Sequence, residues 1–196
     1  MKDCHKPGRH IPVLLPEVVE FLSPKEGGWY LDGTLGLGGH SEAILEAAGA
    51  GARLMGLDRD ARAIELASKR LARFGNNVCV EHARYGDFAA ILEARGWPLL
   101  DGALIDIGVS SMQIDTPERG FSFVHDGPLD MRMNPEGGDA PASTLVNRGS
   151  FETLKRVIAE FGEEPLAGRI ARGIIDARAK GPIESTAELA AVVARA

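Results

Sequence analysis

The stretch that decides the fold is "WYLDGTLGLGGH", residues 29–40, in which an apolar run leads into a loop with four glycines. A helix-like segment, "SEAILEAAG", follows at residues 41–49. Glycines between a strand and a helix let the backbone approach a ligand closely, and the helix N-terminus offers it free N–H groups. A plain tight turn is the alternative. From Gly36 the order is "GLGGHS", so Ser41 stands where the dinucleotide fingerprint has its third glycine, and the loop is a poor NAD signature.

The rest of the first half alternates between apolar runs and helix-like stretches. Buried parallel strands are predicted at residues 29–35, 52–58, 77–83 and 100–108. Helices are predicted at residues 41–49, 61–75 and 87–96. Ser41 is the expected N-cap of the first helix, and Gly49 and Gly75 are the expected ends of the first two. This alternation predicts a doubly wound α/β fold with a parallel sheet and right-handed crossovers.

The second half has a different pattern. Residues 112–144 are rich in Gly, Pro and Asp at turn positions and predict a long loop, which is usually functional or disordered. Helices are predicted at residues 151–162, 165–181 and 185–196. Ser150 is the expected N-cap of the first, with an apolar stripe that ends at Phe161, and Ser185 with Glu188 has the spacing of a capping box.

Composition limits the classes of function. The net charge is −6, with −3 on each side of Gln113, so binding of nucleic acid requires a local basic patch. No window has the roughly 20 apolar residues of a membrane span, and the first ten residues have no apolar signal core. A cytoplasmic protein without a membrane partner is therefore predicted. Cys4 and Cys79 form no disulfide framework, and Cys4 with His5 and His10 lacks the fixed geometry of a metal site, so no metal is predicted.

Polar and aromatic residues follow the predicted strands at one edge of the sheet. Asp58 ends the second strand 20 positions after Gly38, where nucleotide-binding sheets place the acid that binds ribose hydroxyls. Capping of the next helix is the alternative role for Asp58. Asp87 and Phe88 follow the third strand and could contact an adenine, although Phe88 could equally be a core residue. Asp106 follows the fourth strand, and together these residues predict a nucleotide site.

The motifs "HIPVLLPEVVEFL", "DGTLGLGGHS", "GLDRD", "LIDIGVSSMQID" and "ERGFSFVHDGPLDMRM" resemble the ribosomal RNA small-subunit methyltransferase H family, also called MraW. The resemblance runs from about His10 to the last residue. It implies a Rossmann-like fold, S-adenosylmethionine (SAM) as the cofactor and small-subunit ribosomal RNA as the partner. The implied reaction is methylation of the N4 amino group of a cytosine in the decoding region.

The resemblance also implies roles for particular residues. It places Gly38, Gly39 and His40 against the amino-acid and ribose part of the cofactor, and Asp58 on the ribose. It places Phe88, Asp106 and Gln113 around the adenine and methionine parts. It does not support Asp87 as an adenine contact. Asp106 is also the predicted catalytic acid, because a carboxylate aimed at the acceptor amino group can stabilise developing charge and accept a proton.

The resemblance implies two parts, with residues 1–113 as the N-terminal part of the cofactor-binding core and residues 114–196 as a loop plus helical insertion subdomain. In the expected strand order, 3-2-1-4-5-7-6, the fourth strand is central, yet no fifth strand follows, so the chain resembles a shortened form with an incomplete sheet. An uncovered apolar strand is prone to aggregate or to pair with a partner, and a homodimer is one such arrangement.

Two groups of residues are candidates for RNA contact. Arg119, Phe121, Phe123 and Arg132 lie in the long loop, which could instead be packed on itself. Arg169 and Arg172 share a helix face with Lys180 nearby, a pattern that a solvated helix face also explains. An NAD-type oxidoreductase and a catalytically incompetent module that binds SAM or RNA are the competing classes of function.

Overall fold

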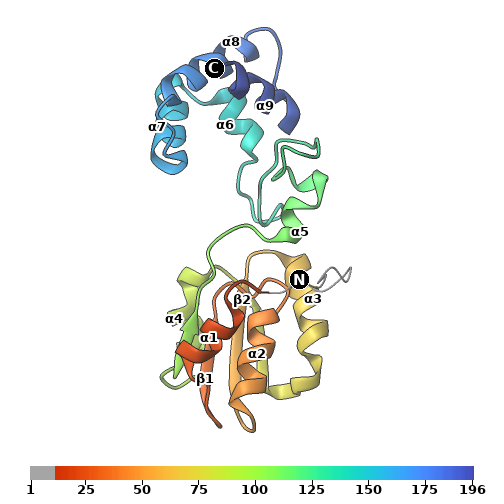
Figure 1. The fold of residues 1–196 in the computed structure, drawn as a ribbon, viewed down its shortest axis with the longest axis vertical. Coiled ribbons are helices and arrows are strands. Elements are labelled where there is room, and N and C mark those ends of the chain that lie inside the picture. Colours follow the sequence, from red (N-terminus) through yellow and green to blue (C-terminus); the bar gives the residue numbers. More distant parts are fainter. Residues whose placement is uncertain (1–11) are drawn as a thin grey trace, which may run out of the picture. The chain divides into compact units, whose positions relative to one another are not determined.

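The computed structural model describes residues 12–196, which form two compact units: the first ends at Gly108 and the second is Val109–Ala196 (Figure 1). The sequence predicts a domain boundary after Gln113, whereas the two compact units of the structure divide after Gly108. That these units are separate domains stays a prediction. The metal site considered at Cys4, His5 and His10 lies outside the described residues. Over residues 12–196 no helix has the length and apolar character that crossing a membrane requires.

Unit 1 is built on a four-stranded parallel sheet with the order β3-β2-β1-β4. The strands are β1 (Trp29–Asp32), β2 (Arg53–Asp58), β3 (Val78–His82) and β4 (Gly102–Leu104). β1 is paired on both sides, with Tyr30 opposite Leu54 of β2 and opposite Gly102 of β4. This order confirms the predicted doubly wound sheet and matches the first four strands of the expected methyltransferase order.

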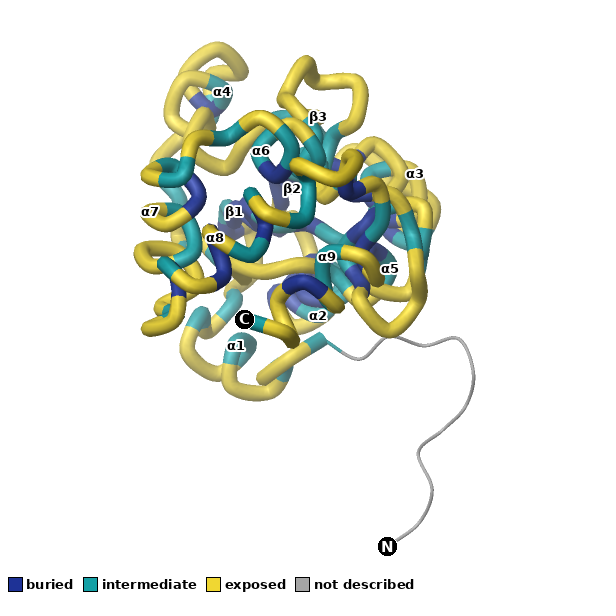
Figure 2. The backbone as a smooth tube through the Cα atoms, turned by 90° about the horizontal axis from the view of Figure 1, so that it is seen from above, coloured by how far each residue is buried: buried dark blue, intermediate teal, exposed yellow. Residues whose placement is uncertain are grey.

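Helices cover both faces of the sheet. They are α1 (Leu15–Leu22), α2 (Gly39–Ala48), α3 (Ala61–Leu71) and α4 (Phe88–Ala94). Figure 1 shows α2 and α3 on one side of the strands and α4 on the other. Alternate strand residues face the two sides: Tyr30 and Leu54 pack against α2, while Leu31 and Met55 pack toward α4. The middle strands β1 and β2 hold most of the buried strand positions (Figure 2).

β4 is much shorter than the predicted strand at residues 100–108. It ends at Leu104, and Ile105 and Ile107 beyond it are exposed, with Ile107 at 77%. Within residues 12–196 β4 pairs with only one strand, β1. No second strand forms hydrogen bonds with its outer edge, so pairing does not lengthen β4 on that side. The prediction of an uncovered apolar edge therefore agrees with the structure, but the prediction of strand length was wrong.

Unit 2 is helical. It contains α5 (Ser111–Ile114), α6 (Ala142–Arg148), α7 (Phe151–Gly162), α8 (Ala167–Arg178) and α9 (Thr186–Arg195), with a short 3₁₀ turn at Pro117–Arg119. The predicted caps are confirmed, because Ser150 accepts from Thr153 N–H and Ser185 forms the capping box with Glu188. The apolar stripe of α7 is shorter than predicted, since Leu154 is buried but Phe161 is 80% exposed.

Three local predictions were wrong. α2 begins at Gly39 with Gly38 as its N-cap, not with Ser41, whose hydroxyl is instead committed to Asp32. α3 ends at Leu71, and a 3₁₀ segment (Ala72–Asn77) with a kink at Gly75 replaces its last turn. The region predicted as a loop at residues 112–144 contains two short helical turns and the start of α6.

Candidate functional site

The loop between β1 and α2 is a tight turn whose backbone requires glycine. Gly36 and Gly38 have φ values of 50° and 73°, in the left-handed region that other residues rarely adopt. The Gly38 N–H donates to the Leu35 carbonyl at 2.8 Å, and the Leu35 N–H donates to the Leu57 carbonyl of β2 at 2.9 Å. The buried side chain of Leu35 lies over Gly56, where a Cβ would be 2.7 Å from Leu35 Cδ1. The loop is therefore anchored on β2.

The glycine loop (residues 33–39) is open at Gly36. A Cβ added at Gly36 would find only the Thr34 carbonyl oxygen, 3.9 Å away. Gly38 provides no side-chain cap to α2, and the first N–H groups of an α-helix have no acceptor within the helix. Those donors and the positive end of the helix dipole suit a carboxylate or another anionic group.

Asp58 is placed directly against the glycine loop. Its Oδ2 accepts from the Gly36 N–H at 2.7 Å, and its Oδ1 accepts from the Asp60 N–H at 2.8 Å. The alternative role of Asp58 as the cap of α3 is excluded, because Asp60 is the N-cap and accepts from Arg62 N–H at 3.1 Å. A carboxylate has further lone pairs, so Asp58 can hold the loop and accept from a ligand hydroxyl at once.

A buried carboxylate supports the loop from beneath. Asp32, at the end of β1, is 1% exposed, and it accepts from Ser41 Oγ at 2.6 Å and from the Thr34 N–H at 3.2 Å. Burial raises the pKa of Asp32, while the hydrogen bond from Ser41 opposes that rise. These bonds tie both ends of the glycine loop to one side chain.

Asp106 lies at the same edge of the sheet. Its N–H donates to Thr34 Oγ1 at 2.7 Å, which joins the segment after β4 to the first residues of the glycine loop. The Asp106 side chain is exposed. The loop, Asp58 and Asp106 therefore share the carboxyl edge of the sheet, as the sequence predicts.

The aromatic residues of the site are also at this edge. Phe88 opens α4 just after the 3₁₀ turn Tyr85–Asp87, and both Phe88 and Tyr85 are partly exposed, at 39% and 43%. Phe88 is therefore not a fully buried core residue. The Cβ of Tyr85 would lie 3.0 Å from a Cβ on Gly33, so this turn lies against the beginning of the glycine loop. Asp87 is exposed and provides no side-chain cap to α4.

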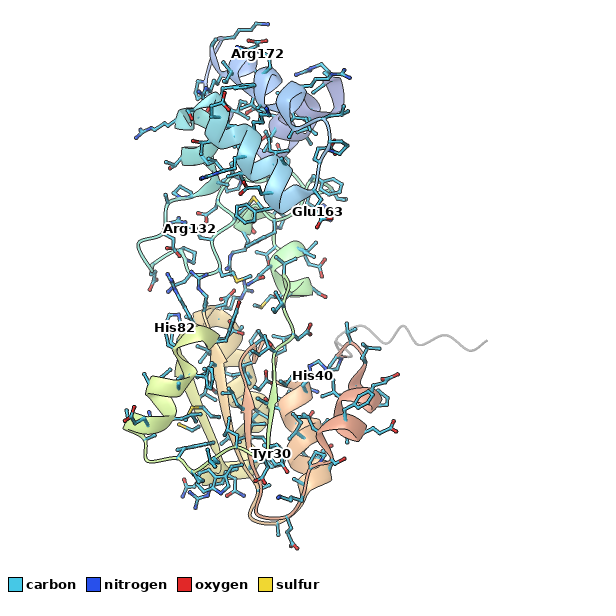
Figure 3. The ribbon with its side chains drawn as sticks, turned by 90° about the vertical axis from the view of Figure 1, so that its left-hand side faces the viewer. Tyr30, His40, His82, Arg132, Glu163 and Arg172 are labelled. Carbon is cyan, nitrogen blue, oxygen red and sulfur yellow. The ribbon has the colours of Figure 1, made fainter. Side chains whose placement is uncertain are left out.

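His40 is held by the segment that precedes α1. Its Nε2 lies 2.9 Å from the Val13 carbonyl oxygen, and the residue is 8% exposed (Figure 3). Pro12 covers Gly39 closely, because a Cβ there would be 3.2 Å from Pro12 Cδ. The imidazole thus fastens the start of α2 to the chain before α1. Its contact with a cofactor stays a prediction.

Gln113 belongs to unit 2. It is 4% exposed, and its Oε1 accepts from the Ser110 N–H at 3.1 Å while Ser110 Oγ accepts from the Gln113 N–H at 3.3 Å. This capping box starts α5. The predicted role of Gln113 at the cofactor stays a prediction.

The long loop of unit 2 is packed on itself. Two of its arginines, predicted as RNA contacts, hold the loop together: Arg119 Nη2 donates to the carbonyls of Arg132 and Met133, and Arg132 pairs with Asp130 at 2.6 Å. That ion pair lowers the pKa of Asp130 and raises that of Arg132. Phe123 is different, because its side chain is 77% exposed.

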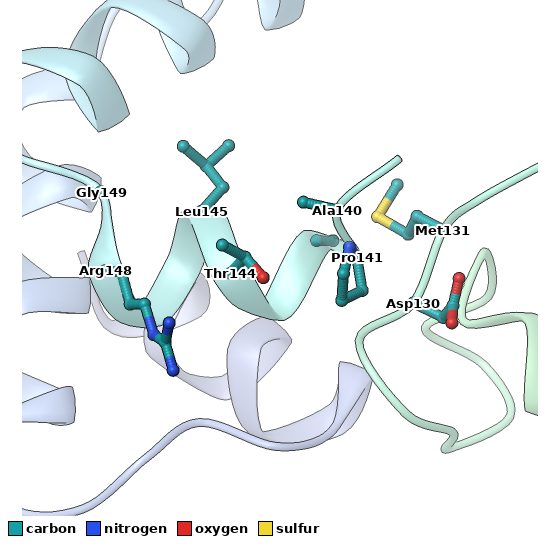
Figure 4. Close-up of a pocket in the computed structure, with 9 residues that line it drawn as sticks. Asp130, Met131, Ala140, Pro141, Thr144, Leu145, Arg148 and Gly149 are labelled. Carbon is teal, nitrogen blue, oxygen red and sulfur yellow. The ribbon is translucent and has the colours of Figure 1, made fainter. Parts of the chain in front are cut away.

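Unit 2 also has an open pocket of about 600 Å³ between α6 and this loop. Met131, Pro141 and Leu145 give it apolar walls, and Thr144 and Arg148 on α6 bring polar groups to it (Figure 4). An apolar wall with one guanidinium can contact a base and a phosphate, so the pocket adds Arg148 to the candidates for RNA contact.

Sequence reasoning missed four residues that shape the site: Asp32, Thr34, Ser41 and Tyr85. A signal for two of them was present, since Asp32 and Thr34 flank Gly33 inside the quoted stretch. The role of Asp32 is shown by its hydrogen bond from Ser41 Oγ, and the role of Thr34 by its hydrogen bond from the Asp106 N–H.

Comparison with known proteins identifies the relatives of this chain. The profile of a family described as the MraW methylase family matches residues 8–196. A protein of Oleidesulfovibrio alaskensis named ribosomal RNA small subunit methyltransferase H is 63% identical over 189 residues, which are 96% of this chain and 58% of that protein. A protein of the same name from Nitratidesulfovibrio vulgaris is 62% identical over 95% of this chain and 52% of its own length. The chain thus spans somewhat more than half the length of these relatives.

Among solved structures, a putative rRNA-methylase from Clostridium thermocellum aligns with a TM-score of 0.37 and 21% identity, over 42% of this chain and 46% of that one. A protein-L-isoaspartate O-methyltransferase aligns with a TM-score of 0.42 and 16% identity, over 65% of this chain and 39% of the other.

Proposed function

Because the chain belongs to the MraW methylase family, we propose that it binds S-adenosylmethionine at the glycine loop and takes part in methylation of small-subunit ribosomal RNA. Family membership supports methyl transfer as the class of reaction, and SAM is the cofactor that such a reaction uses. The two relatives are named ribosomal RNA small subunit methyltransferase H, which supports RNA as the substrate class.

One observation carries the proposal: Asp58 lies 2.7 Å from the backbone nitrogen of Gly36, a position of the loop where an added Cβ would meet only a backbone oxygen. A ribose needs a carboxylate for its hydroxyls, and an amino-acid carboxylate needs free N–H donors. Both are present at the carboxyl edge of the sheet, together with the partly exposed aromatic ring of Phe88 for adenine. The residues present therefore fit an adenosyl amino acid.

When bound, SAM supplies a methyl group on a positively charged sulfur, and transfer to a nitrogen is an in-line displacement that depends on alignment. The chain has to position the acceptor. The exposed carboxylate of Asp106 can accept a hydrogen bond from an amino group, stabilise the positive charge that develops on its nitrogen and then take up the released proton.

The finer proposal is that the acceptor is N4 of a cytosine in the decoding region. The exocyclic nitrogen of cytosine shares its lone pair with the ring, so an acceptor aimed at its protons is needed before it attacks. A base becomes accessible when it leaves its stack, which favours single-stranded RNA. The family resemblance of the box at residues 118–133 supports this specificity.

Calorimetric titration with SAM, S-adenosylhomocysteine and NAD tests the cofactor. We expect both SAM compounds to bind and NAD not to bind. Binding of NAD alone would instead support an oxidoreductase. Transfer of a radiolabelled methyl group to small ribosomal subunits that lack the modification tests the reaction, and binding without any transfer would support a non-catalytic module.

Asp106→Ala should abolish methyl transfer. General acid–base groups typically contribute about 10²-fold or more to the rate, so we expect a loss of at least this size in kcat. Asp101→Ala is the matched control, because Asp101 lies at the opposite end of β4, where it pairs with Lys25. Turnover within about threefold of the unmutated chain, at equal SAM affinity, would show that Asp106 is not catalytic.

Charge reversal on α8 tests the predicted RNA patch. Arg169 and Arg172 are exposed, although Arg172 also lies over the Phe151 ring at 5.0 Å. The double change to Glu should weaken RNA binding and reduce the slope of affinity against salt by about 1.4, because each phosphate contact on a single strand contributes about 0.7. Lys155→Glu with Arg156→Glu on α7 makes the same change of charge as a control. An equal salt slope in both double variants would show that Arg169 and Arg172 do not form an RNA-binding patch.

A further inference from the structure

A cluster of four charged side chains joins α2 to α3 and to the 3₁₀ segment Ala72–Asn77 behind the glycine loop. Arg70 of α3 donates through Nε to Glu42 Oε2 at 2.8 Å, and its Nη2 lies 2.7 Å from the same oxygen. Arg73 donates to the other oxygen, Glu42 Oε1, at 2.9 Å and also pairs with Glu46. We call Glu42, Glu46, Arg70 and Arg73 the α2–α3 network.

The two arginines of this network differ in their relation to the loop. The side chain of Arg70 is 26% exposed and that of Arg73 is 53% exposed. Arg70 Nη1 lies 3.5 Å from the Leu37 carbonyl oxygen and would be 3.3 Å from a Cβ on Gly39. Arg73 has no such contact with the loop in the part of the chain that the structure describes. Arg70 alone of the pair therefore lies against the glycine loop.

The surroundings of Arg70 make α3 the rear wall of the loop. A Cβ on Gly38 would be 3.3 Å from the Cβ of Ala67 and 3.3 Å from Leu71 Cδ1, and Ala67 and Leu71 are both buried. The loop thus rests on α3 by close packing at Gly38 and by a polar contact at Leu37. Both contacts come from one face of α3, since Ala67, Arg70 and Leu71 are three and four residues apart.

Arg70 also neutralises the negative charge of Glu42 near the start of α2. Glu42 lies in the first turn of α2, close to the N–H groups that an anionic ligand would use. Without a partner, its negative charge would oppose a bound carboxylate. The Glu42 side chain is 17% exposed, so this pair is screened less by water than a surface pair.

We propose that Arg70 is a positioning residue of the cofactor site, which holds the glycine loop in its binding conformation through Glu42 and the Leu37 carbonyl. This inference rests on the proposed binding of SAM at that loop. Arg70 touches the loop from behind and makes no contact with the reacting atoms. The competing explanation is an ordinary ion pair between helices, which would affect only stability.

The test compares Arg70→Gln with Arg73→Gln, because both remove one guanidinium from the same network. Three quantities are measured for each: hydrogen exchange of residues 35–41 without ligand, the Kd for SAM by calorimetry, and Tm. For Arg70→Gln we expect exchange and Kd each to rise about tenfold, since a charge-assisted pair of this kind is stronger than a neutral hydrogen bond. For Arg73→Gln we expect both to stay within about twofold, with a similar change in Tm, as for an exposed pair.

Two further variants complete the design. Arg70→Lys retains the charge but loses the planar guanidinium, so its Kd should lie between those of the unmutated chain and Arg70→Gln. Glu42→Gln combined with Arg70→Gln should cost less than the sum of the single changes, because the two side chains act as one unit. If Arg70→Gln does not fold, hydrogen exchange, Kd and Tm of Arg70→Lys and of Glu42→Gln are compared with those of Arg73→Gln instead.

The proposal is overturned if Arg70→Gln changes neither loop exchange nor Kd by more than about twofold, or if Arg73→Gln has equal effects on both. Failure of the unmutated chain to bind SAM would refute the proposed function instead. In that case the exchange measurement without ligand still decides whether Arg70 positions the loop.

Discussion

Asp58→Ala should weaken SAM binding by about 30-fold or more, the largest loss of affinity that we expect from a single change in unit 1. The carboxylate accepts from the N–H groups of Gly36 and Asp60, so its removal takes away one of the contacts that hold the glycine loop on β2. It also removes the proposed acceptor for the ribose hydroxyls. Hydrogen bonds to charged groups contribute about 1.5–3 kcal/mol each, which corresponds to the stated loss. Calorimetry below the Tm of both proteins measures it.

Asp87→Ala is the control for this prediction. Asp87 lies at the same edge of the sheet, but it is exposed and makes no cap to α4. Its removal should change the Kd by less than about twofold, as is usual for a surface substitution. Equal affinity of Asp58→Ala and Asp87→Ala for SAM would refute the role of Asp58.

Gly127→Ala should destabilise unit 2 by about 3 kcal/mol, at the upper end of the cost of overpacking. A Cβ at this position would overlap the Pro117 carbonyl oxygen and lie 2.7 Å from its carbonyl carbon. The backbone of Gly127 cannot move away easily, because its carbonyl accepts from the Thr186 N–H at 2.9 Å and its N–H donates to Thr186 Oγ1 at 3.2 Å. The loop is thereby tied to the start of α9. Denaturant unfolding measures the loss.

Gly168→Ala provides the comparison in the same unit. Gly168 lies inside α8, and a Cβ there would meet nothing within 4 Å. Alanine is a better helix former than glycine by about 1 kcal/mol, so this variant should be as stable as the parent or more stable. A Gly127→Ala variant with unchanged stability would contradict the close approach of Gly127 to the Pro117 carbonyl.

The sheet and the place of the site were predictable because they depend on local signals. Apolar runs that end at Asp58 and near Asp106, with helical patterns between them, are sufficient to define parallel strands, and parallel strands bring their carboxyl ends to one edge. The glycine loop was recognisable in the sequence because its backbone conformation requires glycine at particular positions. Gly36 and Gly38 have φ values of 50° and 73°, which other residues rarely adopt.

The errors concern features that tertiary contacts decide. Ser41 has the composition of an N-cap, but the buried carboxylate of Asp32 takes its hydroxyl, and the helix begins earlier at Gly39. The length of β4 depends on neighbours more than on its own apolar residues. Arg119 and Arg132 have the residue type of an RNA contact, and only their carbonyl and carboxylate partners show that they hold the loop.

A crystal structure of the chain with S-adenosylhomocysteine tests the central claim most directly. We predict the ribose hydroxyls within hydrogen-bonding distance of the Asp58 carboxylate, and the amino-acid carboxylate on the N–H groups at the start of α2. Density for the ligand away from the carboxyl edge of the sheet, with the glycine loop unoccupied, would contradict the account.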